Sequence, residues 1–184
     1  MSNKTLWIAK TGLGLALVIV AQYIGSVTGA NQLVTGSLVN LVLLVVAATS
    51  LSSGLIVATV SPFIAFLFGI GPKLIYIIPA ICIGNMIIVF IYNRALKLQG
   101  TKGGFASVAY PAAGVIVGAA IKALFLWFAV NKVIVPLIAD IKPPMKANFA
   151  TMFSWPQLFT ALIGGAIAIA ILPALKRAKI VKQD

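Results

Sequence analysis

The sequence predicts an all-α polytopic membrane protein, a six-transmembrane-helix bundle that forms a single domain over residues 1–184. Hydrophobic residues make up 61% of the chain and charged residues only 9%, whereas soluble domains are about 45–50% apolar. The apolar residues are also gathered into runs, and about 20 apolar residues are enough for a helix to cross a bilayer. A water-soluble fold could not bury this much apolar surface, so a bundle in a membrane is expected.

The first three apolar runs predict three helices. Residues 4–24 would reach about 31 Å as a helix, enough to cross a hydrocarbon core of about 30 Å. Residues 37–50 are short for a full span, and residues 54–70 contain Pro62. The break between them, "ATSLSSGL", holds small polar residues but no charge. Two short helices with a tight turn fit this break better than one very long span.

The last three runs are residues 73–97, 107–130 and 149–175. Pro111 and Pro156 stand near the starts of the last two, where a helix tolerates proline in its first turn. The connection "NKVIVPLIADIKPPMKAN" joins them. Since a residue before proline favours extended backbone, we expect an extended path from Lys142 onward.

The distribution of cations predicts the orientation. Six spans place both termini on one side, together with Lys4, Lys10, Arg94, Lys97, Lys102, Lys176, Arg177, Lys179 and Lys182. The other side receives Lys73, Lys132, Lys142 and Lys146. Because cytoplasmic loops carry the excess of Lys and Arg, both termini are expected in the cytoplasm.

The uncharged polar stretch "GSVTGANQLVTGSLVN" is then expected outside, as a loop between the first two helices. Its glycines supply bends, and its Asn31, Gln32 and Thr35 would satisfy the amides of a neutral ligand if they point into the bundle. The alternative is an ordinary external turn. The sequence leaves these two interpretations open.

Catalytic chemistry lacks the residues it needs. The chain has no histidine, and its acids are Asp140 and Asp184 alone. Paired carboxylates, metal clusters and nucleophile–histidine pairs cannot be built from this set. There is also no phosphate-binding loop motif, so we expect a protein that is not an enzyme and does not itself hydrolyse ATP. The cations are scattered among apolar spans rather than clustered, which argues against a nucleic-acid partner.

Lys122, in "GAAIKALFLWF", is an ionisable side chain about fifteen residues into the predicted span 107–130. A charge at a helix centre costs about 2.5–3.5 kcal/mol on insertion scales and is a functional candidate by default. The alternative is snorkelling, in which the long stem carries the ammonium to the headgroups. Asn85, in "CIGNMIIV", either bonds to a neighbouring helix or lines a cavity. Cys82 is expected to be a small buried hydrophobe.

Aromatic residues gather near the predicted outer helix ends. Tyr23, Tyr76, Trp127, Phe153 and Trp155 form either an aromatic belt at the membrane interface or a stacking pocket for a planar ligand. In "MFSWPQLF", Ser154 could cap a helix that begins at Pro156, and Gln157 would lie beside its free amide groups.

Five stretches carry a resemblance to a known family. "TGLGLALVIVAQ", "QLVTGSLVN", "SPFIAFLFGIGP", "PAICIGNMIIVFIYN" and "MFSWPQLFTALIGG" resemble the substrate-binding membrane subunits (S components) of energy-coupling factor (ECF) transporters, the bacterial vitamin importers. The last four are similar to a branch associated with cobalamin uptake. The resemblance covers nearly the whole chain.

This resemblance implies a multi-pass protein of the bacterial cytoplasmic membrane that captures a vitamin, cobalamin or its precursor cobinamide, on the external side. The first external loop would fold over the site. The partners implied are a transmembrane coupling subunit and two cytoplasmic ATPases, which alone use ATP. No metal and no covalently bound cofactor are expected. The alternatives are another vitamin (folate, pantothenate, riboflavin or thiamine), a stand-alone carrier or channel, or a structural subunit without a ligand. An anionic vitamin could recruit Lys122 or Lys73.

Two sets of candidate residues follow. The expected substrate-binding residues are Tyr23, Asn31, Gln32, Thr35, Asn40, Tyr76, Asn85, Lys122, Trp127, Trp155 and Gln157. Gly12 and Ala16 form a small-xxx-small pair, a spacing that lets another helix approach closely. The resemblance implies that this pair faces the coupling subunit, with Gly14 sharing the face.

Overall fold

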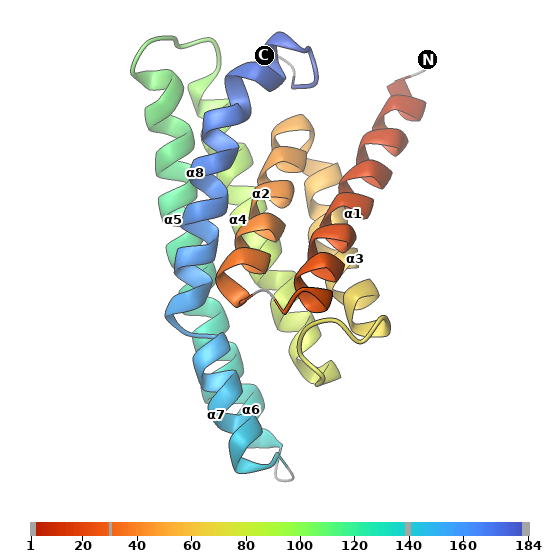
Figure 1. The fold of residues 1–184 in the computed structure, drawn as a ribbon. Helices are drawn as coiled ribbons and strands as arrows, with labels where there is room; N and C mark the ends of the chain where they lie inside the picture. Colours follow the sequence, from red (N-terminus) through yellow and green to blue (C-terminus); the bar gives the residue numbers. More distant parts are fainter. Residues whose placement is uncertain (1–2, 30, 139–140, 182–184) are drawn as a thin grey trace.

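The computed structural model describes residues 3–29, 31–138 and 141–181, and every regular element within them is helical (Figure 1). In chain order these are α1 (Asn3–Val27), α2 (Gln32–Thr49), α3 (Leu51–Leu67), the 3₁₀ helix η1 (Ile75–Ile77), α4 (Ile78–Gln99), α5 (Ala106–Phe128), the π-helix η2 (Ala129–Ile134), α6 (Val135–Leu137), α7 (Pro143–Met152) and α8 (Trp155–Arg177). The all-α prediction is confirmed.

The helices suit a membrane. Five stretches of the described chain are long and apolar enough to cross a bilayer: Lys4–Val27, Gln32–Thr49, Ile75–Gln99, Ala106–Leu137 and Pro143–Arg177. Leu51–Leu67 is apolar but shorter. Length and composition together indicate a multi-pass membrane protein. The start of α1 and the end of α8 lie at the same end of the bundle, which we call the termini end (Figure 1).

The predicted break between the second and third helices is confirmed. Ser50 alone separates α2 from α3, and its extended backbone (φ −166°, ψ 134°) turns the chain. Its hydroxyl accepts a hydrogen bond from the backbone N–H of Ser53 at 3.4 Å. A serine in this position satisfies an amide that the first turn of a helix leaves free.

The prediction of a loop over residues 25–40 is wrong. Helix α1 continues to Val27, and α2 begins at Gln32 with Asn31 as its N-cap. The side-chain oxygen of Asn31 accepts from the backbone N–H of Val34 at 3.1 Å. Polarity was the misleading signal, because Thr and Ser are tolerated in a helix when tertiary packing holds it. Only Gly29, with φ at +65°, requires the freedom of glycine here.

The prediction of a long extended connection over residues 131–148 is also wrong. Helix α5 continues through η2 and α6 to Leu137, and α7 already begins at Pro143. Lys142 is extended (φ −60°, ψ 143°), as expected before a proline. The two prolines after it start α7, because the first turn of a helix needs no N–H from them. Asp140 lies outside the described residues.

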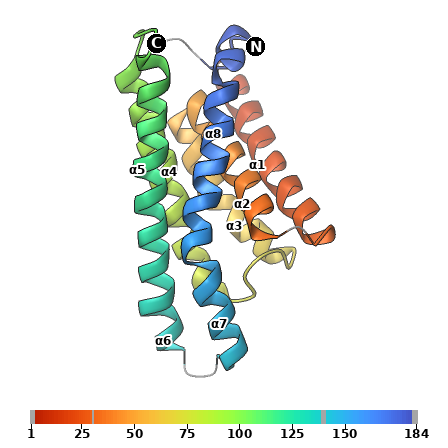
Figure 2. The same cartoon turned by 60° about the vertical axis from the view of Figure 1, so that its left-hand side comes forward.

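The sixth predicted segment is two helices. Helices α7 and α8 are separated at Phe153 and Ser154. Ser154 stands at the N-cap position of α8, but its hydroxyl donates to the carbonyl of Thr151 at 2.7 Å instead of capping α8. Figures 1 and 2 both show α6 and α7 projecting beyond the other helices, at the end opposite the termini.

Two clusters of buried apolar side chains hold the bundle together. The larger one joins α1, α2, α3, α4, α5 and α8 through aliphatic and small residues such as Leu43, Val57, Ile88 and Ala161. The smaller one lies toward the projecting end and includes Ile77, Leu126, Val130, Phe149 and Phe153. On α4 and α5, the polar residues Asn85 and Lys122 lie in the sequence between members of the two clusters.

Candidate functional site

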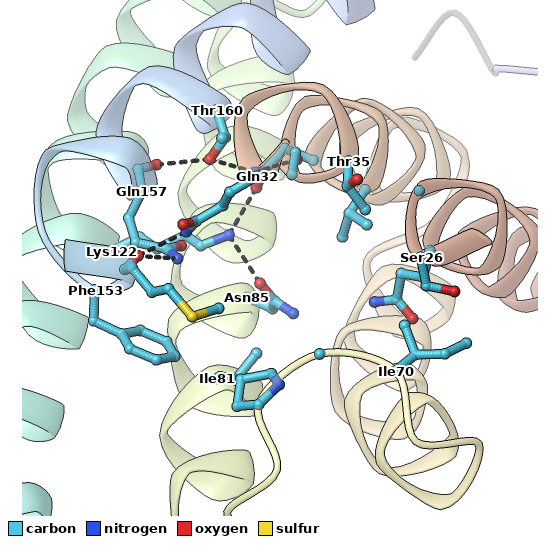
Figure 3. Close-up of a pocket in the computed structure, with 18 residues that line it drawn as sticks. Ser26, Gln32, Thr35, Ile70, Ile81, Asn85, Lys122, Phe153, Gln157 and Thr160 are labelled. Atoms are coloured by element: carbon cyan, nitrogen blue, oxygen red, sulfur yellow. Dashed lines mark hydrogen bonds between the residues drawn. The ribbon is translucent and has the colours of Figure 1, made fainter. Parts of the chain in front are cut away.

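A cavity of about 340 Å³ opens among the helix ends opposite the termini (Figure 3). Its walls come from the last turns of α1, the first half of α2, the segment 70–72 before η1, helices α4 and α5, and the junction of α7 with α8. This volume lies at the lower end of the range of about 300–1,000 Å³ typical of small-molecule sites.

Lys122 lies at the inner end of the cavity. Its side chain is only 3% exposed, and its Nζ donates to Asn40 Oδ1 at 2.7 Å and to Asn85 Oδ1 at 2.8 Å. Figure 3 shows the contact with Asn85. Helices α2, α4 and α5 thus meet at one ammonium group. The snorkelling interpretation is wrong, because the side chain turns into the bundle and is held there by two charge-assisted hydrogen bonds.

Asn40 is oriented by a second set of contacts. Its Nδ2 donates to the carbonyl of Gly36 at 2.8 Å and to Thr160 Oγ1 at 3.4 Å. The hydroxyl of Thr160 in turn donates to the carbonyl of Gln157 at 3.2 Å. With its nitrogen engaged in this way, the amide of Asn40 presents its oxygen to Lys122.

Two glycines allow α2 and α8 to approach closely at this point. A Cβ atom at Gly164 would collide with the carbonyl oxygen of Ser37 and would lie 2.7 Å from the backbone nitrogen of Leu41. A Cβ at Gly36 would lie 2.7 Å from Thr160 Cγ2. Close approach of the two backbones therefore brings Asn40 and Thr160 within reach of each other.

Three amide side chains hold the junction between α7 and α8. The carbonyl of Met152 accepts from Gln32 Nε2 at 2.7 Å and from Gln157 Nε2 at 3.0 Å. The carbonyl of Phe153 accepts from Asn131 Nδ2 at 3.2 Å, and Asn131 belongs to the π-helix η2. The Gln32 contact ties α2 to α7 at the edge of the cavity. These bonds satisfy carbonyls that the end of α7 would otherwise leave free.

The cavity gathers about half of the predicted site residues. Gln32, Thr35, Asn40, Asn85, Lys122 and Gln157 all line it. Of the aromatic candidates, Phe153 lines the cavity, whereas Tyr23, Tyr76, Trp127 and Trp155 lie outside it, with exposed fractions between 42% and 64%. Their outward direction fits an interfacial belt rather than a stacking pocket. Asn31 is exposed and is occupied as the cap of α2.

Sequence reasoning missed several lining residues. Gln22, Ser26, Ile81, Met152 and Thr160 line the cavity, together with residues 70–72. Gln22 and Thr160 carried the same signal that marked Asn85, a neutral polar side chain within an apolar helix. The apolar members carried no signal, because nothing in a membrane sequence distinguishes a side chain facing a cavity from one facing lipid.

The small residues of α1 do not share one face. Gly12 and Ala16 are exposed, and no atom lies within 4 Å of a Cβ built at Gly12. Gly14 instead faces α2, where a Cβ would lie 2.5 Å from Val46 Cγ2. The expectation that Gly14 shares a docking face with Gly12 and Ala16 is therefore wrong, because Gly14 is buried inside the bundle.

The described residues contain no group of three or more His, Cys, Asp or Glu side chains that could hold a metal ion. Cys82 is buried, as expected, and its Sγ donates to the carbonyl of Thr59 at 3.2 Å. The site consists instead of one cation, amides, hydroxyls and apolar walls. This set of groups can hold and orient a small molecule.

No protein-family model, curated protein or solved structure matches this chain. The likeness to S components therefore rests on the five quoted stretches alone.

Proposed function

We propose that this protein is the substrate-binding membrane subunit of a vitamin importer of the ECF type. The observation that carries the proposal is the cavity at the end opposite the termini, with Lys122 buried at its inner end among Asn40 and Asn85. A buried ionisable side chain in a membrane helix defaults to a functional role. A cavity with a few converging polar groups on apolar walls suits the binding of one small molecule.

The proposed direction of transport follows from the cation count. If the termini end is cytoplasmic, as the excess of Lys and Arg predicts, the cavity faces the outside and receives the vitamin there. The subunit would then release it inward with energy from two ATPases, through a transmembrane coupling subunit. The exposed Gly12 and Ala16 on α1 support a helix partner, because small residues allow the closest approach between helices.

The volume of the cavity bears on the choice of vitamin. Cobalamin and cobinamide are the vitamins suggested by sequence resemblance, and they stay in the proposal as candidates. A cavity of about 340 Å³ favours a molecule much smaller than a corrinoid. Biotin, pantothenate, nicotinate, thiamine or riboflavin would bury a larger share of their surface in it.

Binding titrations of the purified protein in lipid nanodiscs test the first half of the proposal. Cobalamin, cobinamide, riboflavin, thiamine, folate, pantothenate, biotin and nicotinate are titrated, each with and without the Lys122→Met substitution. We expect saturable binding of at least one vitamin, weakened by the substitution. Saturable binding with the same affinity in the Lys122→Met variant would show that the ligand binds outside the cavity.

Purification from native membranes and uptake assays test the second half. We expect the protein to copurify with a coupling subunit and two ATPases, and uptake of the bound vitamin to stop when the ATPases are inactivated. Uptake that survives ATPase inactivation would instead favour a stand-alone carrier.

A further inference from the structure

At the inner end of the cavity, the contacts of Lys122 fix which atoms of the neighbouring amides donate and which accept hydrogen bonds. Lys122 Nζ lies 2.7 Å from Asn40 Oδ1 and 2.8 Å from Asn85 Oδ1. An ammonium group only donates hydrogen bonds, so both amides must turn their oxygens toward Lys122 and their nitrogens away from it. The orientation of both amides follows from this chemistry.

The two amide nitrogens have different surroundings. Asn40 Nδ2 is engaged by Gly36 and Thr160. Asn85 Nδ2 donates to no group within residues 3–29, 31–138 and 141–181, and Figure 3 shows it directed away from Lys122, toward the open part of the cavity. Lys122 also keeps one N–H, since an ammonium has three and two are used. The hydrogen-bonding groups that stay free at this end of the cavity are therefore N–H donors, on Asn85 Nδ2 and on the positively charged Nζ of Lys122.

The charge of Lys122 is not balanced by the described chain. Asp140 and Asp184 are the only acids in the sequence, and both lie outside the described residues. Burying an ion without a counter-ion is costly, and neutral amides offset only part of that cost. An anionic group on the ligand would supply the missing charge and would accept from the free donors.

The rest of the described lining is uncharged and combines neutral polar side chains, such as Gln22 and Gln157, with apolar ones. Val39, Ile81, Phe153 and Met152 contribute apolar wall, and the described lining residues include no second cation. A molecule with one negative group and an uncharged body matches this distribution. The volume of about 340 Å³ suits one or two small rings, or an acyl chain of similar size.

Resting on the proposed function, we propose that the substrate is a small organic monoacid whose carboxylate docks between Lys122 Nζ and Asn85 Nδ2. Its uncharged body lies against the apolar wall. Lys122 provides charge, Asn85 provides a second donor, and Asn40 holds Lys122 in place from the opposite side. Neutral vitamins, and cationic ones such as thiamine, are discriminated against by the unbalanced ammonium.

Matched pairs of acids and their neutral derivatives test this assignment. The nanodisc-embedded protein is titrated with biotin and biotinamide, pantothenate and panthenol, nicotinate and nicotinamide, and lipoate and lipoamide. Cobalamin, riboflavin and thiamine are added as uncharged or cationic probes. We expect at least one acid to bind saturably and to bind about 10- to 100-fold more tightly than its neutral partner, the effect of one charged hydrogen-bond pair.

Substitution of Asn85→Asp is the sharpest variant, because it adds an internal carboxylate to Lys122 with almost no change in volume. We expect it to fold and to lose about 10- to 100-fold in affinity for the acid, with little effect on any neutral probe. The matched control is Asn31→Asp, which adds the same charge outside the cavity and keeps a good N-cap for α2. If Asn85→Asp fails to fold, Lys122→Met serves instead, with the exposed Lys132→Met as its control.

The outcomes separate the two levels of the proposal. Acid preference that disappears in Asn85→Asp or Lys122→Met and persists in the controls supports the assignment. Saturable binding without preference for the acid over its neutral partner overturns the monoacid, while the binding function stands. Absence of saturable binding by every probe overturns the proposed function and the monoacid together.

Discussion

The same three helices, α2, α4 and α8, pack closely through apolar side chains at one end of the bundle and surround a polar cavity at the other. Toward the termini end, α2, α4 and α8 meet through aliphatic and small side chains such as Leu43, Ile88 and Ala168, all essentially inaccessible. Toward the other end, the same three helices carry Asn40, Asn85 and Thr160 around a cavity. Tight packing at one end holds the polar groups at the other in fixed positions, so close packing and the polar cavity occupy different parts of each helix.

Polarity alone does not distinguish the ends. The termini end also buries polar groups: Thr11 Oγ1 donates to Ser53 Oγ at 2.8 Å, and Asn93 Nδ2 donates to the carbonyl of Ala47 at 2.8 Å. These contacts are between neutral groups and tie helices together. The cavity end differs in holding a cation with spare donors. An unbalanced charge, rather than a polar side chain, is what distinguishes the cavity end.

The largest effect is expected from Gly164→Leu, which breaks the packing that the cavity depends on. A Cβ there would collide with the Ser37 carbonyl and with the backbone of Leu41. Since backbone cannot move aside as a flexible side chain can, we expect a loss of about 3 kcal/mol of stability. Thermal unfolding and size-exclusion chromatography in detergent measure it. An unchanged melting temperature would show that α2 and α8 separate without cost.

Gly12→Leu is the matched control for that substitution. No atom lies within 4 Å of a Cβ at Gly12, so we expect unchanged stability and unchanged ligand binding. Assembly with the coupling subunit should nevertheless be lost, because bulk on an exposed small-residue face blocks close helix approach. Copurification measures this, and intact assembly would place the docking surface elsewhere.

Asn40→Leu is expected to have the next largest effect, because it removes one of the two amide oxygens that hold Lys122. Leaving a buried charged donor without one partner costs about 1–3 kcal/mol. We expect stability to fall by about 2 kcal/mol and affinity for the ligand to fall about 10-fold as Lys122 loses its position. Unfolding curves and titrations on the same preparation separate the two effects. Weaker stability with full affinity would mean that Asn85 alone positions the ammonium.

Gln32→Leu should have a smaller effect, confined to kinetics. Its amide bridges α2 to the Met152 carbonyl at the cavity edge, and one neutral hydrogen bond is worth about 0.5–1.5 kcal/mol. We expect ligand dissociation to be about 2- to 10-fold faster, with little change in unfolding. Stopped-flow displacement measures the rate. Gln157→Leu, which removes the other amide on the same carbonyl, provides the comparison within α8.

The smallest effect is expected from Trp127→Leu and Trp155→Leu. Both side chains are exposed and lie outside the cavity. We expect ligand affinity to stay within about 2-fold of the original, since neither ring contacts the site. A large loss of affinity in titration would restore the stacking pocket and would place the ligand nearer the surface of the bundle.

Local signals predicted the helices well where apolarity was continuous. The tight turn at Ser50 followed from small polar residues without charge. The stretch over residues 25–40 failed, because neutral polar residues belong equally to a loop or to a helix facing a cavity. The segment after Phe128 failed for a different reason, since a π-helix and a proline-initiated α7 continue the helical path where the prolines suggested a break.

Among the site residues, prediction succeeded where burying a side chain is costly. Lys122 and Asn85 stood out because membrane helices rarely carry such groups. The Trp and Tyr candidates stood out equally but lie outside the cavity, since Trp and Tyr have an independent reason to gather at a membrane interface. Met152 and Ile81 line the cavity without any local signal.

The sequence by itself determined an all-helical membrane protein with nearly no acids, a cationic side chain within an apolar span and an uneven distribution of cations. These are properties of composition and of short segments, so they can be predicted without knowledge of any tertiary contact. Only the tertiary structure decided that Lys122 meets Asn40, 82 residues away, and that Gly14 faces inward while Gly12 faces outward. Those outcomes depend on which helix faces touch, and the faces are chosen by close contacts at Gly36 and Gly164 that hydropathy cannot register.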